Sequence, residues 1–194
     1  MLTKAEVSQL YVAIFNRASE GEGNAYWQKQ GSISSVANQM LATSDAKGYF
    51  GTSLNTNQSF IEHIYKNTLN KTYTEDKSGI DYWVAQLNNG SSRGDVVASL
   101  INAIGSYAPG GSNYNATDTK TVTAYNQFNN RVSVSDYMMI SLLYIMVNHA
   151  ILKVLHHHPM IGFSVMNSFL ININSYCQIR IIPIIRIVHC FTIR

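Results

Sequence analysis

The stretches Gly23-Asn24-Ala25-Tyr26-Trp27 and Gly79-Ile80-Asp81-Tyr82-Trp83 share the pattern Gly-x-x-Tyr-Trp and contain the only two Trp residues of the chain. A further Tyr precedes each stretch, Tyr11 in the first case and Tyr65 in the second. Corresponding positions are 54 to 56 residues apart. A fixed period of this size is typical of repeat architectures. The sequence therefore predicts two copies of one structural unit.

Hydrophobic residues recur at helical spacing within both copies, which indicates helices with one buried face. Capping boxes at Thr3 to Glu6 and at Ser59 to Glu62 mark two helix starts, because a hydroxyl and a carboxylate there satisfy free N–H groups. We expect the third helix of the first copy to end near Gly48. Each unit alone is small for a stable core, so we expect the two units to pack together and to bury their aromatic faces jointly.

The predicted fold is all-α, with two tandem three-helix repeats, one further helix and a C-terminal tail of different composition. A linker rich in the turn-forming residues Gly, Ser and Asn separates the repeats from the further helix. The boundaries are 1–107 for the repeat domain, with copies at 3–50 and 57–107, then 108–116 for the linker, 117–137 for the additional helix and 138–194 for the tail.

Composition changes near residue 137. All eleven acidic residues lie at or before Asp136, whereas residues 138–194 carry four Lys or Arg, no acid and both Cys. Reading from the last base of the Met codon turns Met138-Met139 and Met139-Ile140 into Asp codons, so a shifted frame would restore acidic residues. We hypothesise that a frameshift near codon 137 produced this tail, which we then expect to be poorly ordered. A reading of the tail as native remains the alternative.

The chain shows no pattern that directs it to nucleic acid or across a membrane. Basic residues are scattered and form no stripe for phosphate contacts. The longest apolar run of the tail, Met138–Val147, falls short of the roughly 20 residues that span a bilayer. The N-terminus lacks the apolar stretch of a Sec signal peptide. We therefore expect no nucleic-acid partner and no membrane span. The protein is then cytosolic, or a fragment of a larger secreted protein, or exported by a route that reads another signal.

The second copy carries the most specific motif, Asp76-x-x-Gly79-x-x-Tyr82-Trp83-x-x-x-Leu87-x-x-Gly90-x-x-Arg93. It resembles the bacterial domain of unknown function 4214 family, and the resemblance covers roughly residues 5–105. The second copy departs from the family pattern by Lys71 for Arg and by two extra residues before Asp76. The first copy has Glu20 for Asp and matches through Leu10, Tyr11, Arg17, Gly23, Tyr26 and Trp27.

The resemblance implies an all-helical, non-enzymatic module of bacterial secreted or cell-surface proteins, including S-layer-like and RTX-like calcium-binding chains. It implies other protein modules or cell-surface glycans as partners, an extracellular or cell-surface location and no cofactor of its own. Calcium would belong to the full-length protein. The alternatives are a carbohydrate-binding module that uses Tyr and Trp faces, or an accessory domain of a larger secreted enzyme.

No catalytic, cofactor or metal residue is predicted. The acids Glu20, Glu22, Glu75 and Asp76 invite a calcium hypothesis, but their spacing matches no EF-hand loop, and we interpret them as solvated loop residues. We interpret the Tyr-Trp pairs as core residues that tie each unit together, with a platform for sugar rings as the alternative. The predicted structural motif consists of Tyr11, Arg17, Gly23, Tyr26, Trp27, Tyr65, Asp76, Gly79, Tyr82, Trp83, Leu87, Gly90 and Arg93.

Overall fold

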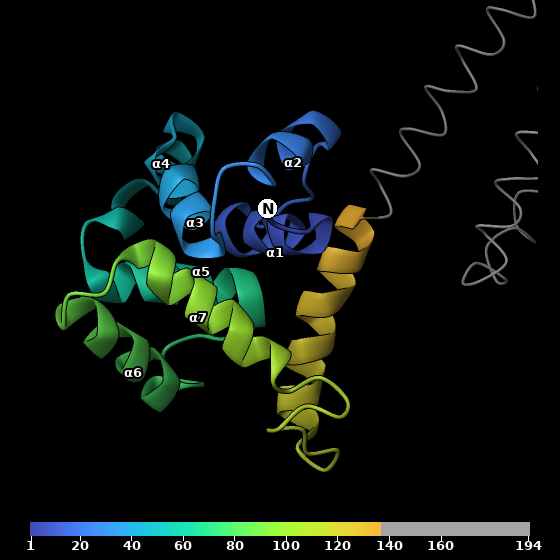
Figure 1. The fold of residues 1–194 in the computed structure, drawn as a ribbon. Helices are drawn as coiled ribbons and strands as arrows, with labels where there is room; N and C mark the ends of the chain where they lie inside the picture. The colour runs from blue at the N-terminus through green and yellow to red at the C-terminus, as the bar shows by residue number, and fades with distance from the viewer. Residues whose placement is uncertain (137–194) are drawn as a thin grey trace, which may run out of the picture. The chain divides into compact units, whose positions relative to one another are not determined.

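A computed structural model describes residues 1–136, and the predicted tail of residues 138–194 lies outside them. Every regular element in this part of the chain is a helix, which confirms the all-α prediction (Figure 1). The elements are α1 (Lys4–Phe15), α2 (Gly21–Trp27), α3 (Ile33–Ala42), α4 (Ser44–Phe50), the 3-10 helix η1 (Gly51–Leu54), α5 (Asn57–Leu69), α6 (Lys77–Asn88), α7 (Arg93–Gly105) and a helix of residues 119–136.

The helix starts follow local capping chemistry. The capping box of α1 is present, since Thr3 Oγ1 accepts from the N–H of Glu6 at 3.2 Å and Glu6 accepts from the N–H of Thr3 at 2.7 Å. The predicted box at Ser59 is wrong, because α5 begins three residues earlier. Its N-cap is Thr56, whose hydroxyl accepts from the N–H of Ser59 at 3.0 Å. A Thr cap at this position satisfies an N–H that otherwise has no helical partner.

The third helix of the first copy is divided, contrary to the prediction of one helix ending near Gly48. Thr43 breaks it by taking an extended conformation with ψ of 156°. Its hydroxyl accepts from the N–H of Ala46 at 3.2 Å and donates to the carbonyl of Met40 at 2.7 Å. One side chain thus ends α3 and begins α4, and α4 adds the buried Phe50 to the core.

The helices α1 and α5 end in the same unusual backbone conformation. Asn16 follows α1 with φ of 49° and Asn70 follows α5 with φ of 54°, and these are the only residues other than Gly with positive φ in the described part of the chain. Asn tolerates this left-handed region better than most residues. The two copies therefore share a backbone turn in addition to their side chains.

Corresponding helices of the two copies pack on each other, α1 on α5 and α3 on α7. The short helix α2 packs on α1, whereas α6 packs on α5 and α7, so that α2 and α6 lie on opposite sides of the core (Figure 1). We expected the aromatic pairs of α2 and α6 to be buried jointly between the copies. Their positions on opposite sides of the core show that they are not. The shared core is built mainly from aliphatic side chains of the longer helices, together with the buried aromatic residues Tyr11, Phe50, Phe60, Tyr65 and Phe128.

Helices α3 and α7 approach each other closely at Gly94. The N–H of Gly94 donates to Oδ1 of Asn38 at 2.8 Å, and Nδ2 of Asn38 donates to the hydroxyl of Ser92 at 3.0 Å. A Cβ atom on Gly94 would stand 2.4 Å from the carbonyl oxygen of Ser34. This contact leaves room only for hydrogen at that position.

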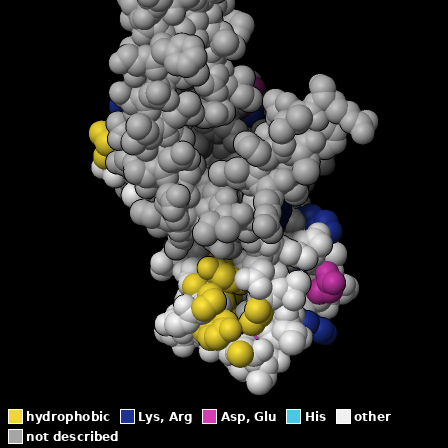
Figure 2. Space-filling model, turned by 90° about the vertical axis from the view of Figure 1, so that its right-hand side faces the viewer, with side chains coloured by type: hydrophobic (Ala, Val, Ile, Leu, Met, Phe, Trp, Pro, Cys, Tyr) yellow, Lys and Arg dark blue, Asp and Glu magenta, His cyan; other side chains and the backbone are white. Residues whose placement is uncertain are grey.

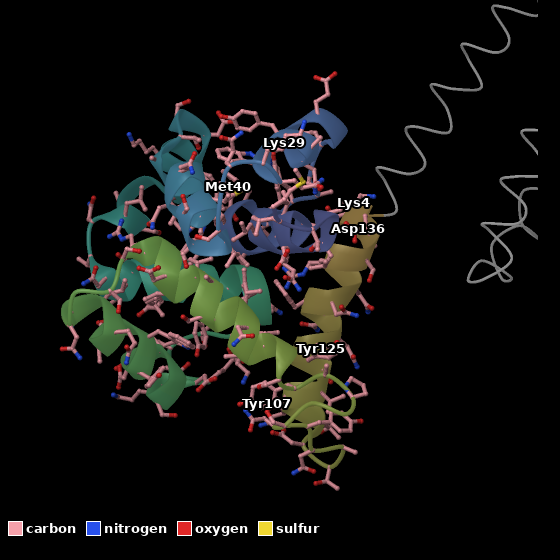
Figure 3. All side chains as sticks on the ribbon, in the orientation of Figure 1. Lys4, Lys29, Met40, Tyr107, Tyr125 and Asp136 are labelled. Atoms are coloured by element: carbon pink, nitrogen blue, oxygen red, sulfur yellow. The ribbon has the colours of Figure 1, made fainter. Side chains whose placement is uncertain are left out.

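The further helix spans residues 119–136 and begins at Asp118, whose carboxylate accepts from the N–H of Thr121 at 3.1 Å. Phe128 and Val132 place its apolar face in the common core. Its last turn lies beside the first copy, where Nζ of Lys4 donates to the backbone carbonyl of Asp136 at 3.0 Å (Figure 3). The helix therefore belongs to the same core as the repeats.

A buried polar cluster fixes the end of this helix against the first copy. Oγ of Ser135 accepts from the N–H of Ser19 at 2.9 Å, and the hydroxyl of Ser8 donates to Asp136 at 2.6 Å. Nδ2 of Asn24 donates to the hydroxyl of Ser19 at 3.0 Å. Buried polar groups that find partners in this way specify one arrangement of the helices.

Candidate functional site

Each copy places a buried Tyr hydroxyl directly against a Gly of the Gly-x-x-Tyr-Trp motif. A Cβ atom built on Gly23 would stand 2.6 Å from the hydroxyl oxygen of Tyr11, and one on Gly79 would stand 2.6 Å from that of Tyr65. Neither Gly has a positive φ. The motif therefore needs Gly because the Tyr hydroxyl occupies the space of a side chain, and not because of backbone freedom.

The Trp of each motif acts on the same hydroxyl. Burial raises the pKa of both Tyr hydroxyls, and the negative charges of Glu20 and Asp76 respectively raise them further. Trp27 offsets part of this rise in the pKa of Tyr11, and Trp83 does so for Tyr65, because an indole N–H favours the ionised oxygen. This effect is smaller than that of burial. Tyr, Gly and Trp thus form one structural tie between the first two helices of each copy.

The remaining Tyr of each motif lies at the surface. Tyr26 is 55% exposed and Tyr82 is 56% exposed, so our expectation that both residues of each pair are core residues is wrong for these two. Each ring meets its neighbouring Trp edge to face, with ring centroids 5.0 Å apart for Tyr26 and Trp27 and 4.9 Å apart for Tyr82 and Trp83. The Trp packs on the core and the Tyr stands outside it, because consecutive helical residues point in different directions.

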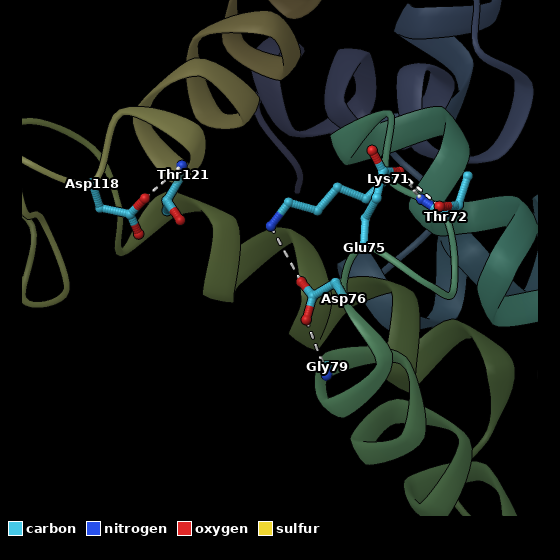
Figure 4. Close-up of polar contacts among 7 residues, drawn as sticks. All are labelled: Lys71, Thr72, Glu75, Asp76, Gly79, Asp118 and Thr121. Atoms are coloured by element: carbon cyan, nitrogen blue, oxygen red, sulfur yellow. Dashed lines mark hydrogen bonds and ion pairs between the residues drawn. The ribbon is translucent and has the colours of Figure 1, made fainter.

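The charged residues of the turn differ between the copies. Arg17 pairs with Glu20 at the surface, and its guanidinium group lies 5.3 Å from the ring centroid of Tyr11. In the second copy Nζ of Lys71 lies 3.3 Å from Oδ2 of Asp76 (Figure 4). Each side chain of that pair is only 25% exposed.

Asp76 also begins α6, because its Oδ1 accepts from the N–H of Gly79 at 3.2 Å (Figure 4). Neighbouring Glu75 accepts from the N–H and the hydroxyl of Thr72, each at 2.7 Å. The acids of this turn are therefore engaged in turn and capping contacts. In residues 1–136 no group of three or more His, Cys, Asp or Glu side chains is placed to hold a metal ion.

The last three motif residues connect α6 to α7. Leu87 is buried, and Gly90 follows α6 with φ of 97°, a conformation that favours Gly. Arg93 begins α7, where it donates to the carbonyl of Leu54 at 2.8 Å. Its guanidinium carbon stands 4.6 Å from the ring centroid of Phe60, and burial lowers its pKa. All three residues thus have structural contacts.

A cavity of about 400 Å³ opens beside the second motif, between α5, α6, α7 and the helix of residues 119–136. Its polar lining includes the Lys71–Asp76 pair and Thr121. Its volume is near the lower end of the range of small-molecule sites, roughly 300 to 1,000 Å³. Five aromatic side chains line it, namely Tyr65, Tyr82, Trp83, Tyr107 and Tyr125.

Sequence reasoning missed the contribution of residues outside the motif. Tyr107, which follows the end of α7, and Tyr125, from the further helix, lie at the same end of the molecule (Figure 3). Figure 2 shows hydrophobic side chains gathered towards this lower end on the side turned to the viewer. The aromatic type of Tyr107 and Tyr125 was the available signal, but only the packing of α7 and of the further helix brings them to the second motif.

The fold and the site define an all-helical module whose first two helices in each copy are joined by a Tyr–Gly–Trp tie. Residues 37–104 match the model of the family described as Domain of unknown function (DUF4214), which confirms the resemblance over this stretch, whereas the first-copy motif from Tyr11 to Trp27 lies outside the match. The match runs from within α3 to the end of α7, across the boundary between the two copies. No curated protein and no solved structure shows significant similarity to the chain.

No helix in residues 1–136 combines the length and the apolar character that a membrane span requires.

Proposed function

We propose that this chain is a non-enzymatic structural or interaction module of a bacterial secreted or cell-surface protein, S-layer-like or RTX-like in its setting. The observation that carries the proposal is the exposure of Tyr26 and Tyr82 at corresponding positions of the two copies. Tyr is enriched at interfaces because its ring is apolar and its hydroxyl remains polar. Two such residues on opposite sides of the core give the module two contact points.

The contacts of the ionisable motif residues support a role without catalysis. Arg17 is paired with Glu20, Lys71 with Asp76, and Arg93 is held by Leu54 and Phe60. Catalytic acids, bases and nucleophiles are generally held in clefts beside one another. Of these residues only Lys71 and Asp76 line a cavity, and Asp76 there caps α6, while the others stabilise turns and a helix start, which suits a module that contributes a surface.

The proposed partners are other protein modules or glycans at a bacterial cell surface, and the proposed location is extracellular or cell-surface. A carbohydrate-binding module is the second candidate, and the aromatic cavity beside Tyr82 and Trp83 favours it over an accessory domain of an enzyme. Both candidates make the exposed aromatic residues the contact surface, and they differ in the chemistry of the partner.

Co-sedimentation of the purified chain with isolated bacterial cell envelopes tests this proposal. We expect the chain to pellet with envelopes, and the double variant Tyr26→Ser/Tyr82→Ser to remain in the supernatant. The matched control is Tyr114→Ser, since Tyr114 is 39% exposed and belongs to neither motif. Unchanged sedimentation of the double variant, or equal loss with Tyr114→Ser, would refute the role of the two Tyr residues.

A further inference from the structure

The cavity beside the second motif combines aromatic surfaces with the oppositely charged pair of Lys71 and Asp76, whose net charge is zero. Tyr82 is more than half exposed, whereas Tyr65, which also lines the cavity, is buried. An exposed ring supported by buried rings offers a rigid flat surface. Such surfaces pack against the apolar faces of flat, ring-shaped ligands with little loss of side-chain freedom.

The polar groups of the cavity can both donate and accept hydrogen bonds. Lys71 offers N–H donors, Asp76 offers acceptor oxygens, and the hydroxyl of Thr121 can do either. The 3.3 Å separation between Nζ of Lys71 and Oδ2 of Asp76 leaves their charges opposed and nearly balanced. The carboxylate of Asp118, a few residues before Thr121, also lowers any excess of positive charge near Lys71. A ligand with many uncharged hydroxyl groups fits this lining better than an anion or a cation.

We propose that this cavity is a binding site for a neutral saccharide, with a sugar ring on Tyr82 and Trp83 and its hydroxyl groups on Lys71, Asp76 and Thr121. The site rests on the proposed function, because it names the ligand class of one of the module's two contact points. Its specificity comes from residues on both sides of the cavity. Thr121 and the ring of Tyr125, both from the further helix, complete a site that the repeat alone would leave open.

The first copy supplies a matched control within the same chain. Tyr26 and Trp27 have the same edge-to-face geometry as Tyr82 and Trp83. Their nearby charge pair, Arg17 and Glu20, is much more exposed than Lys71 and Asp76. Binding at the cavity should therefore perturb Trp83 and leave Trp27 unchanged.

The test is a titration of the ¹⁵N-labelled full chain with maltotetraose, cellotetraose and tetra-N-acetylchitotetraose. Nuclear magnetic resonance monitors the titration through the indole N–H signals of the two Trp residues. The variant Trp27→Phe assigns the signals. We expect at least one of these neutral sugars to shift the Trp83 signal with a dissociation constant in the range of about 1 mM or lower. Tetragalacturonate, which is anionic, should leave the signal in place.

Two variants separate the site from general effects on the fold. Tyr82→Ser should weaken saccharide binding about tenfold, whereas Tyr26→Ser should leave it unchanged. Lys71→Met should also weaken binding, because it removes the donors beside Asp76. Far-UV circular dichroism shows whether each variant is folded.

No response of Trp83 to any neutral sugar, equal shifts of both Trp signals, or stronger binding of tetragalacturonate would overturn the saccharide site. Co-sedimentation with cell envelopes measures binding of the module to its partners without depending on the saccharide titration. Envelope binding that depends on Tyr26 and Tyr82 without any saccharide response would remove this inference and retain the proposed function.

Discussion

Arg131 donates a hydrogen bond to Oδ1 of Asn16 at 2.8 Å, although 115 positions separate the two residues. The same guanidinium group donates to the backbone carbonyl of Asn67 and, at 2.8 Å, to that of Thr68. These carbonyls lie in the last turn of α5, where helical partners are missing. Arg131 thereby connects the ends of α1 and α5 to the further helix, and burial lowers its pKa.

Replacing Arg131 should destabilise the fold markedly. Arg131→Met leaves the carbonyls of Asn67 and Thr68 without this donor, and we expect the free energy of unfolding to fall by about 1 to 3 kcal/mol. Urea unfolding followed by circular dichroism measures the change. Arg17→Met is the matched control, since its surface pair with Glu20 should contribute roughly 0 to 1 kcal/mol. Equal effects of the two variants would contradict the bridging role of Arg131.

Gly79→Ala should disrupt the tie of the second copy. The added methyl group would meet the hydroxyl oxygen of Tyr65, so that Tyr65 must move, and we expect a loss of about 1 to 3 kcal/mol of stability. Gly48→Ala in α4 is the control, because nothing lies within 4 Å of its Cβ position. It should stabilise the chain by up to about 1 kcal/mol through helix propensity. Thermal unfolding of both variants checks these opposite signs, and a stabilised Gly79→Ala protein would refute the steric account.

The turn residue Asn70 should be replaceable by Gly but not by Ala. Its φ of 54° is left-handed, a region that costs a residue with Cβ roughly 1 to 2 kcal/mol. We expect Asn70→Gly to match or exceed the wild type in unfolding free energy and Asn70→Ala to fall about 1 kcal/mol below Asn70→Gly. Chemical denaturation of the two variants measures this difference, which should vanish if the turn is not left-handed in solution.

Stability should decrease as pH rises above the ordinary Tyr pKa of 10.0. Burial raises the pKa of Tyr65 in the folded chain, and Asp76 raises it further, so the unfolded chain ionises first. Above pH 10 the unfolded state therefore binds fewer protons than the folded state, and the free energy of unfolding falls with pH. Below pH 10 this contribution is complete.

Unfolding curves at pH 8 to 12, combined with the tyrosinate absorbance, check the alkaline prediction. Tyr65→Phe should show a weaker dependence on pH above 10, because one of the shifted groups is removed. Replacing an exposed residue, as in Tyr114→Phe, should leave the wild-type slope. A Tyr65→Phe protein with the wild-type slope would exclude Tyr65 as a source of the effect.

The helical fold could be predicted because its signals are local. Helical spacing of apolar residues, the box at Thr3 and the cap at Ser92 act within one turn of the chain. The break at Thr43 was missed because Thr is tolerated inside a helix as well as at its start, and only the packing of Phe50 in the core favours the start. The cap at Thr56 was missed for a related reason, since Thr56 and Ser59 are both good cap residues.

The site was predictable in part. The Gly-x-x-Tyr-Trp pattern located Tyr65, Gly79 and Trp83, whose contacts lie within one copy. The exposure of Tyr82 was missed, because an aromatic residue beside Trp gives no sign of which of the two faces inward. The contribution of Tyr125 depends on long-range packing of the further helix, which the sequence predicts as an element but does not place against the second copy.

The pairing of α1 with α5 and of α3 with α7 places corresponding helices of the two copies against each other. The apolar residues on the paired faces are therefore buried only while both copies are present. A fragment that kept only one copy would expose the faces of its helices that the other copy covers in the whole chain.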